Sequence, residues 1–273
     1  MQYFSKALIT SAFVVFSIWV VSGHTLGSDC PLPADPQSVD IRRVYDGDTL
    51  LLNDGRKVRL IGINTPELGR SGQPDQPLAI QATAAARRLL KGQNPVRLQL
   101  GSQSKDHYGR VLGHIFLANG RNLEAELLKQ GLGFAISIPP NLSLRDCLNQ
   151  AERGARQAKL GVWDEPYYQP IPASSLNRHS GGFGRYRGTI SRAGTNTKGR
   201  YLELSGKIFV PIETGTATAL DSISSDNLLG LQLEIRGWLI ARTRSKAQKN
   251  RGFLPFMLKI NHMDDLRLCD PNC

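Results

Sequence analysis

The sequence lacks the motifs of several large enzyme classes. It contains no P-loop, no glycine-rich dinucleotide pattern and no serine-centred elbow, which excludes P-loop ATPases, Rossmann-type dehydrogenases and α/β-hydrolases. No Asp, Cys or Ser lies at a recognisable catalytic spacing from His24, His114, His179 or His262, which argues against a histidine-activated nucleophile. The four cysteines do not follow a zinc-binding spacing.

Long hydrophobic runs are also scarce, and the prominent one lies at the N-terminus. It extends from Ala7 to Val21, which is typical of a signal peptide and short for a membrane span of about 20 residues. We therefore expect a signal peptide over residues 1–27 and an exported protein, periplasmic or secreted. The alternative is an uncleaved anchor, and membrane contact is expected only in that case.

The cysteines are few but even in number. In an oxidising compartment, Cys30, Cys147, Cys269 and Cys273 predict two disulfides, and three pairings are possible. We favour Cys30 with Cys147, tying the N-terminal arm to the first domain, and Cys269 with Cys273, closing a small loop. Free thiols are the alternative.

Acidic residues are outnumbered by basic ones. The chain has 34 Lys and Arg against 23 Asp and Glu, a net charge of +11 and a pI near 9.7. This balance favours a polyanionic partner, most simply nucleic acid, although basicity can also serve solubility alone. Nothing in the sequence indicates a stable protein partner.

The alternation of apolar and polar residues predicts two domains in the 273 residues. In the first, residues 38–165, strands precede and flank three helices, which predicts an α+β domain with an antiparallel barrel and helices packed outside. The expected strands cover residues 39–44, 49–52, 57–63, 96–100 and 111–117, and the expected helices cover 77–91, 122–130 and 144–160.

Residues 166–180 are rich in proline and serine and are expected to form a linker. Residues 181–268 predict a second, small all-β domain, with a tail at 269–273. Its expected strands cover residues 186–190, 201–204, 208–210, 231–240 and 256–260.

A basic run in this second domain, residues 242–251, is expected on a loop between strands. Its Arg242, Arg244 and Lys246 are candidates for binding a phosphate backbone. Aromatic residues such as Trp238 could offer stacking faces, or could belong to the core.

Polar residues with a shared chemistry cluster in three short stretches of the first domain: Asp46-Gly47-Asp48-Thr49, Val58 to Glu67, and Asp106 to Arg110. The first two place three carboxylates, an Asn amide and an arginine within 22 residues. Carboxylate and amide oxygens bind hard cations, and guanidinium groups bind phosphate. Together they are suited to metal-assisted hydrolysis of a phosphodiester.

These stretches, in this order and spacing, resemble the staphylococcal nuclease (thermonuclease) family over residues 39–163, including the closing Lys159-Leu160-Gly161-Val162-Trp163. The resemblance implies a five-stranded oligonucleotide-binding (OB) barrel with three helices. It also implies a Ca²⁺-dependent endonuclease that cuts DNA or RNA and leaves 3′-phosphate ends. For the appended second domain, the strand pattern alone predicts another small barrel of the OB type.

The resemblance also implies a role for each motif residue. Asp48, Asn64 and the Thr65 carbonyl would hold Ca²⁺, with Asp46 just outside. Glu67 would be the general base, and Arg59 and Arg110 would clamp the phosphate. His107 and Tyr108 would lie near the nucleotide. Separately, each acid could be a turn or loop residue and each arginine a surface ion pair.

Three departures from the family pattern are visible. Asn64 stands where the family has an aspartate, which weakens or alters the expected metal preference, and His107 replaces a lysine. Ile136 and Ile138 occupy the positions of two nucleotide-binding tyrosines. Two rivals to the nuclease prediction therefore remain, a weak or inactive nucleic-acid-binding protein, and an envelope protein that binds another polyanion or a protein.

Overall fold

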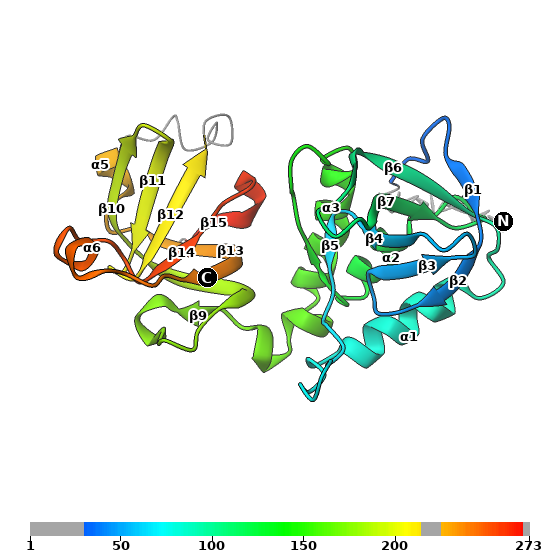
Figure 1. Cartoon of the computed structure of the whole chain (residues 1–273), viewed down its shortest axis with the longest axis horizontal. Helices are drawn as coiled ribbons and strands as arrows, with labels where there is room; N and C mark the ends of the chain where they lie inside the picture. The colour runs from blue at the N-terminus through cyan, green and yellow to red at the C-terminus, as the bar shows by residue number, and fades with distance from the viewer. Residues whose placement is uncertain (1–29, 214–224, 270–273) are drawn as a thin grey trace, which may run out of the picture.

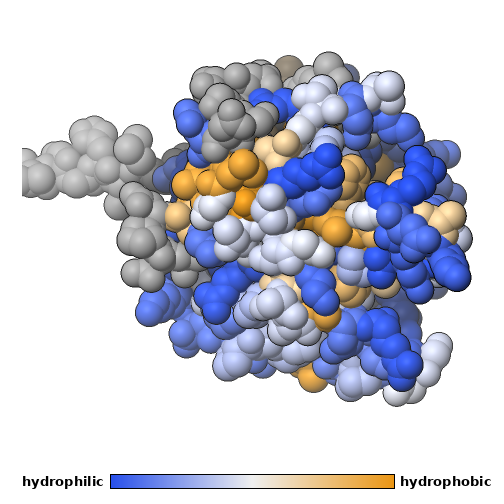
Figure 2. Space-filling view, turned by 90° about the vertical axis from the view of Figure 1, so that its left-hand side faces the viewer, coloured by the Kyte–Doolittle hydropathy of each residue, from blue (hydrophilic) through white to orange (hydrophobic). Residues whose placement is uncertain are grey.

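The structure consists of two β barrels joined by a short segment. It is a computed structural model that describes residues 30–213 and 225–269, so the expected signal peptide lies outside the described residues. The two barrels lie side by side along the long axis of the molecule (Figure 1). Hydrophilic residues cover most of the end of the second barrel that faces away from the first (Figure 2).

The first barrel has the strand order of an OB fold. Its strands pair in the order β1-β6-β7-β4-β3-β2, and only the β4–β7 pair is parallel. Since β1 and β2 are separated by Asp40 alone, one bent strand pairs with both β6 and β3 and closes a five-stranded barrel, as predicted. The strands are β1 (Gln37–Val39), β2 (Ile41–Val44), β3 (Thr49–Leu52), β4 (Lys57–Leu60), β6 (Val96–Lys105) and β7 (Val111–Phe116).

Three helices pack on this barrel, as predicted: α1 (Ala79–Leu90), α2 (Leu123–Lys129) and α3 (Arg145–Gln157). Each is slightly shorter than expected. α2, for example, begins after Asn122, whose side chain accepts a hydrogen bond from Ala125 N. Among the described residues, no helix is long and apolar enough to cross a membrane.

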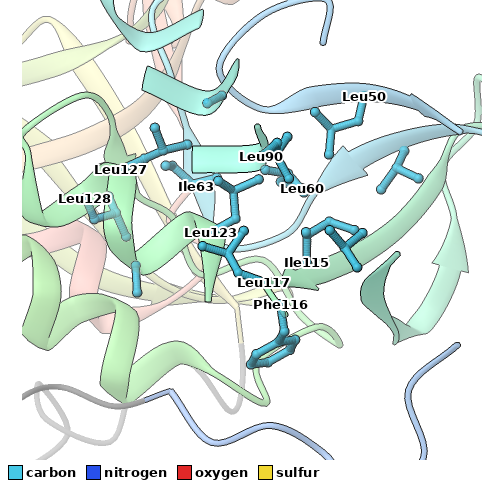
Figure 3. Packing of buried hydrophobic residues seen from close by; sticks show 14 of the residues in the cluster. Leu50, Leu60, Ile63, Leu90, Ile115, Phe116, Leu117, Leu123, Leu127 and Leu128 are labelled. Carbon is cyan, nitrogen blue, oxygen red and sulfur yellow. The ribbon is translucent and has the colours of Figure 1, made fainter. Parts of the chain in front are cut away.

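The core of the first domain fills the space between barrel and helices. Figure 3 shows Leu50, Leu60 and Ile115 from the strands beside Leu123 and Leu127 from α2, all fully buried. The alternation that predicted the strands places these side chains on the inner face, because successive strand residues point to opposite sides. This packing makes the barrel a rigid support for the loops at its rim.

A disulfide joins Cys30 to Cys147 of α3, which confirms that pairing. The bond closes a sequence separation of 117 residues and lies against the core of the first domain. Cys273 lies outside the described residues, so the pairing of Cys269 with Cys273 stays a prediction.

The second barrel has the same topology as the first. Its strands pair in the order β10-β11-β12-β14-β13, and a further β13–β10 pairing closes the ring. The β12–β14 pair is parallel, like β4–β7. This confirms the all-β prediction and gives the OB-type order. The elements are β10 (Gly182–Asn196), β11 (Gly199–Leu204), β12 (Ile208–Glu213), α5 (Ser225–Leu228), β13 (Gln232–Ala241), β14 (Phe256–Leu258) and β15 (Leu266–Cys269).

Several details of the second domain differ from the prediction. β10 does not end at Ile190 but continues to Asn196, because a register shift after Ile190 lets it pair with β13 first and with β11 afterwards. The edge strand β15 was not predicted. The basic run is not all loop, since Lys246–Asn250 form helix α6 with a capping box at Ser245.

The segment expected to be a linker packs against both domains. The Tyr168 hydroxyl donates a hydrogen bond to Pro77 O at 2.7 Å, in the first domain. β9 (Ile171–Pro172) pairs with β10, and Ala173 and Leu176 are buried in the core of the second barrel. Residues 166–180 therefore connect the barrels through contacts rather than as a flexible tether.

Buried ion pairs join the two domains. Arg236 of β13 donates to Glu152 of α3 at 2.7 Å, and both side chains are less than a tenth exposed. The same Glu152 oxygen accepts a hydrogen bond from Ala135 N. Beside this pair, Arg185 of β10 forms a bidentate pair with Glu234 of β13, and Arg156 of α3 also reaches Glu234.

Aromatic rings fill the rest of this interface. The ring of Phe134, from the first domain, lies 5.2 Å from Trp163 and 5.5 Å from Phe183 of β10. The Arg156 and Arg185 guanidiniums each lie 4.9 Å from the Trp163 ring. The interface thus combines buried ion pairs with aromatic packing, and together these contacts fix the orientation of the two barrels.

The disulfide should contribute measurably to stability. Replacing Cys30 and Cys147 together with serine removes a cross-link that restricts the unfolded chain, so we expect a loss of about 2–5 kcal/mol in the free energy of unfolding. Urea unfolding followed by circular dichroism measures this loss. A double variant as stable as the oxidised wild type would contradict the expected role of the bond.

The Arg236–Glu152 pair should be strongly coupled. Arg236→Met leaves Glu152 buried without its cation, and we expect it to lower the free energy of unfolding by about 3–5 kcal/mol. Glu152→Gln in the same chain should recover part of the loss, because a neutral amide needs no counterion. Arg153→Met, on the exposed side of α3, is the control and should change stability by no more than about 0.5 kcal/mol. Additive effects in this double-mutant cycle would contradict the coupling.

Candidate active site

The turn between β2 and β3 places two carboxylates inside the protein. Asp46 and Asp48 are almost fully buried, at 2% and 1% exposure. Gly47 between them packs against Thr65, and a Cβ at position 47 would lie 2.7 Å from the Thr65 hydroxyl. The glycine is therefore needed for the close approach of this turn to the chain leaving β4.

Asp48 is the centre of this arrangement. Its Oδ2 accepts hydrogen bonds from Thr65 N at 2.8 Å and from the Thr65 hydroxyl at 3.0 Å. The same oxygen lies 3.1 Å from Arg59 Nη1, while Oδ1 accepts from the Thr49 hydroxyl. These contacts fix the carboxylate between the first two motifs of the sequence.

Arg59 of β4 spans the same region. Its Nη1 donates to the carbonyls of Leu60 and Ile63, and its Nη2 donates to the Asn64 side-chain oxygen at 3.1 Å. Asn64 belongs to the two-residue strand β5 (Ile63–Asn64), which pairs with β8 (Phe134–Ala135). The Asn64 amide and the Asp48 carboxylate thus both contact the guanidinium of Arg59.

Glu67 shares the electrostatic field of the two aspartates. Neighbouring protein atoms partly desolvate its carboxyl, and the charges of Asp48 and Asp46 oppose its ionisation, so its pKa is raised. Arg59 and Arg70 act in the opposite direction. Burial and the adjacent Asp48 likewise raise the pKa of Asp46. Asp46 and Glu67 are therefore close enough to Asp48 for its charge to disfavour theirs.

The third motif forms a turn with its own internal contacts. Asp106 accepts hydrogen bonds from Arg110 Nε at 2.6 Å and from the backbone N–H groups of Tyr108 and Arg110. These bonds outweigh desolvation and lower the pKa of Asp106. The Arg110 guanidinium lies 5.6 Å from the Tyr108 ring, which packs against His107.

Two hollows flank this turn. One, of about 750 Å³, is lined by Thr49, Leu68, Arg70, Tyr108 and Arg110, among others. It therefore borders the residues next to Asp48 and Glu67 in the chain.

The other hollow, of about 510 Å³, contains Arg59 and Arg110 together with Ile136, Ile138 and, from the second barrel, Trp238. We call it the inter-barrel pocket. The Arg59 and Arg110 side chains, expected to act together, thus line one cavity.

The residues around Asp48 could bind a hard cation only if neutral oxygens served as ligands beside the carboxylates. In residues 30–213 and 225–269, no group of three or more His, Cys, Asp and Glu side chains converges as metal ligands. Buried Asp48, with Asn64 and the Thr65 carbonyl nearby, offers carboxylate, amide and peptide oxygens, which Ca²⁺ accepts. Burial and then the neighbouring carboxylates raise the pKa values of Asp46 and Glu67, and a cation here would offset the repulsion between these carboxylates.

The basic run of the second barrel lies elsewhere. Arg242, Arg244 and Lys246 lie at or next to α6, at the end of the second barrel remote from the first (Figure 1). Arg244 Nη1 donates to Phe253 O, and the Arg242 guanidinium lies 5.3 Å from the Phe253 ring. The structure therefore does not bring these residues together with Arg59 and Arg110.

Sequence reasoning did not assign Arg70 to this region, and it named Trp238 as a stacking or core residue of the second domain without linking it to the first. Arg70 contacts Asp46 at 3.4 Å. Since Arg70 lies only three residues after Glu67 in the sequence, its place near the site could have been predicted. Trp238 lies more than 120 positions from Arg110, and no local pattern connects the two. His114, which has no catalytic-type partner in the sequence, is instead buried against Glu124 at 2.8 Å.

The family model described as "Staphylococcal nuclease homologue" matches residues 57–165. The thermonuclease of Staphylococcus intermedius is 32% identical over 160 residues, which cover 58% of this chain and 94% of that protein. The thermonuclease of Staphylococcus hyicus is also 32% identical, covering 57% and 94%. Endonuclease YncB of Bacillus subtilis is 30% identical, covering 48% and 64%.

The amide at position 64 should limit cation affinity. Asn64→Asp adds a carboxylate beside Asp48 and Thr65, so we expect Ca²⁺ to bind at least about tenfold more tightly, as measured by isothermal titration calorimetry. Asn53→Asp, which adds the same charge in the exposed β3–β4 turn, is the control and should leave Ca²⁺ affinity unchanged. Equal affinity in wild type and Asn64→Asp would place the cation elsewhere.

Proposed function

The chain belongs to the staphylococcal nuclease family, and from that premise we propose that it is an exported, Ca²⁺-dependent endonuclease acting on DNA or RNA. One observation carries the proposal: Asp48, the most buried of three mutually interacting carboxylates, contacts Arg59, which shares a pocket with Arg110. This combination offers oxygen ligands for a cation and guanidinium donors for a phosphate.

The proposed roles follow from these positions. Asp48, Asn64 and the Thr65 carbonyl hold the cation, with Asp46 behind them. When bound, Ca²⁺ supplies positive charge that stabilises the phosphate in the transition state and acidifies water. Glu67 accepts the proton of the attacking water. The raised pKa of Glu67 lies closer to neutral pH. A general base is most effective when its pKa is near the working pH.

The arginines and the substrate complete the reaction. Arg59 and Arg110 donate hydrogen bonds to the phosphate oxygens, on which negative charge grows as water attacks phosphorus. The bond between phosphorus and the 5′ oxygen breaks, and that oxygen takes up a proton. The products are a 3′-phosphate and a 5′-hydroxyl end. His107 and Tyr108, at the exposed rim beside Arg110, are proposed to contact the nucleotide.

Export is supported by the N-terminal sequence and by the disulfide. Disulfides persist in oxidising compartments. Cys30, which is bonded to Cys147, lies only a few residues after the end of the expected signal peptide. We therefore place the working protein in the periplasm or outside the cell.

A second candidate function is supported by Asn64. Its side-chain oxygen is hydrogen-bonded to Arg59, and no cluster of three acidic, His or Cys ligands is found among the described residues. A protein with these features could bind nucleic acid on a nuclease scaffold without cutting it.

The nuclease proposal is tested by Glu67→Gln. With single-stranded DNA and RNA as substrates, Ca²⁺-dependent cleavage by the wild type should stop on adding a chelator. Glu67→Gln should lower kcat at least about 100-fold, because glutamine cannot accept the proton of water. Glu203→Gln, in β11 of the second barrel, is the matched control and should cleave at the wild-type rate.

One result would contradict the proposed role of Glu67, and another would overturn the nuclease proposal itself. Cleavage by Glu67→Gln at the wild-type rate would remove Glu67 from catalysis. Salt-sensitive binding without cleavage in Ca²⁺, Mg²⁺ or Mn²⁺ would favour the second candidate, a nucleic-acid-binding protein.

A further inference from the structure

The inter-barrel pocket is built by both domains. The first barrel provides Arg59 and Arg110 and an aliphatic wall that includes Leu112, Ile136 and Ile138. The second barrel provides a single residue, Trp238 of β13, whose side chain is 40% exposed. Trp238 therefore lines the same pocket as the two arginines and is the contribution of the second barrel to it.

The indole of Trp238 is held in place. In the β10–β13 pairing it lies opposite Phe183, and their ring centroids are 4.8 Å apart. Phe183 in turn packs against Phe134 of the first domain, at 5.5 Å. Trp238 is therefore fixed by contacts that include the other barrel.

The ion pairs of the interface also fix β13. Alternate residues of this strand divide between its two faces: Leu233, Ile235 and Leu239 fill the core of the second barrel. The opposite face carries Glu234, Arg236 and Trp238. Since Arg236 is paired with Glu152 of the first domain, Trp238, two residues farther along the same face, is positioned over the pocket.

The chemistry of this pocket matches a nucleotide. Guanidiniums bind a phosphate, and an indole face stacks on a base, whichever base it is. The aliphatic Ile136 and Ile138 offer no such ring. The volume of about 510 Å³ lies in the range of small-molecule sites. A base can reach the indole only when it is unstacked from its neighbours, as in a single strand.

We propose that Trp238 stacks on a nucleobase of a single-stranded substrate whose phosphate is bound by Arg59 and Arg110, so that the two barrels share one binding site. This inference rests on the proposed nuclease function for the identity of the ligand. It adds a base-binding residue from the appended domain to the site that holds the phosphate.

The test compares strands with and without bases. Full-length protein is titrated, in chelator so that no cleavage occurs, with a fluorescent single-stranded thymidine 10-mer and with a 10-mer of abasic nucleotides. Trp238→Ala should raise Kd for the thymidine strand about tenfold and leave Kd for the abasic strand unchanged. Trp238→Phe should keep most of the affinity, because it retains a ring.

Ile240→Ala is the matched control, since Ile240 is also exposed and lies two residues farther along β13. It should bind both strands as the wild type does. Thermal unfolding of each variant checks that the fold is intact. Because Trp238→Phe preserves packing, its affinity remains informative even if Trp238→Ala is destabilised.

Two outcomes would overturn the inference: wild-type binding of the thymidine strand by Trp238→Ala, or an equal loss for both strands. The first means that the indole does not touch the base, and the second that its role is structural. Failure of the nuclease proposal looks different. A protein that never cleaves but loses only base-dependent affinity in Trp238→Ala would keep the inference and discard the catalysis.

Discussion

The pairing of Arg236 with Glu152 is the contact on which the arrangement of the two barrels depends. A buried charge is costly unless its partner is present at hydrogen-bonding distance. Because Glu152 also accepts a hydrogen bond from Ala135 N, the pair connects β13, α3 and β8. Few other relative orientations of the barrels could satisfy these groups. The inter-barrel pocket depends on this orientation, because its lining comes from both barrels.

The candidate active site can be understood as a balance of charge. Burial and the charge of Asp48 raise the pKa of Asp46 and of Glu67, and Arg59 offsets part of this rise from a position fixed by two carbonyls and Asn64. An aspartate at position 64 would add a fourth negative charge to this group. The asparagine keeps an oxygen that accepts a hydrogen bond from Arg59, without adding that charge.

Much of the first domain could be predicted from the sequence because its signals are local. Asp46 and Asp48 lie within one turn, Glu67 follows within 22 residues, and Asp106 and Arg110 lie within one turn. The strands expected from the alternation and the Cys30–Cys147 pairing were likewise predicted correctly.

What sequence reasoning missed depends on long-range contacts. Glu152 and Arg236 are 84 residues apart, and only the folded chain shows that each neutralises the other. The sequence places Trp238 on a strand but does not show whether its ring lies in the core or at the surface. Only the folded chain shows that the ring is part exposed and borders the first barrel. The basic run near Arg242 was conspicuous in the sequence, but it lies away from the arginines of the candidate site.

The central claim is that nucleic acid occupies the pocket between the barrels. Photo-crosslinking of the full-length protein to a single-stranded oligonucleotide containing 5-iodouracil, in chelator and followed by peptide mass spectrometry, tests it most directly. The account predicts crosslinks to Trp238 and to Tyr108, the aromatic residues of the pocket. Crosslinks confined to Phe209 and Phe253, beside the basic run, would contradict it and place the strand on the far end of the second barrel.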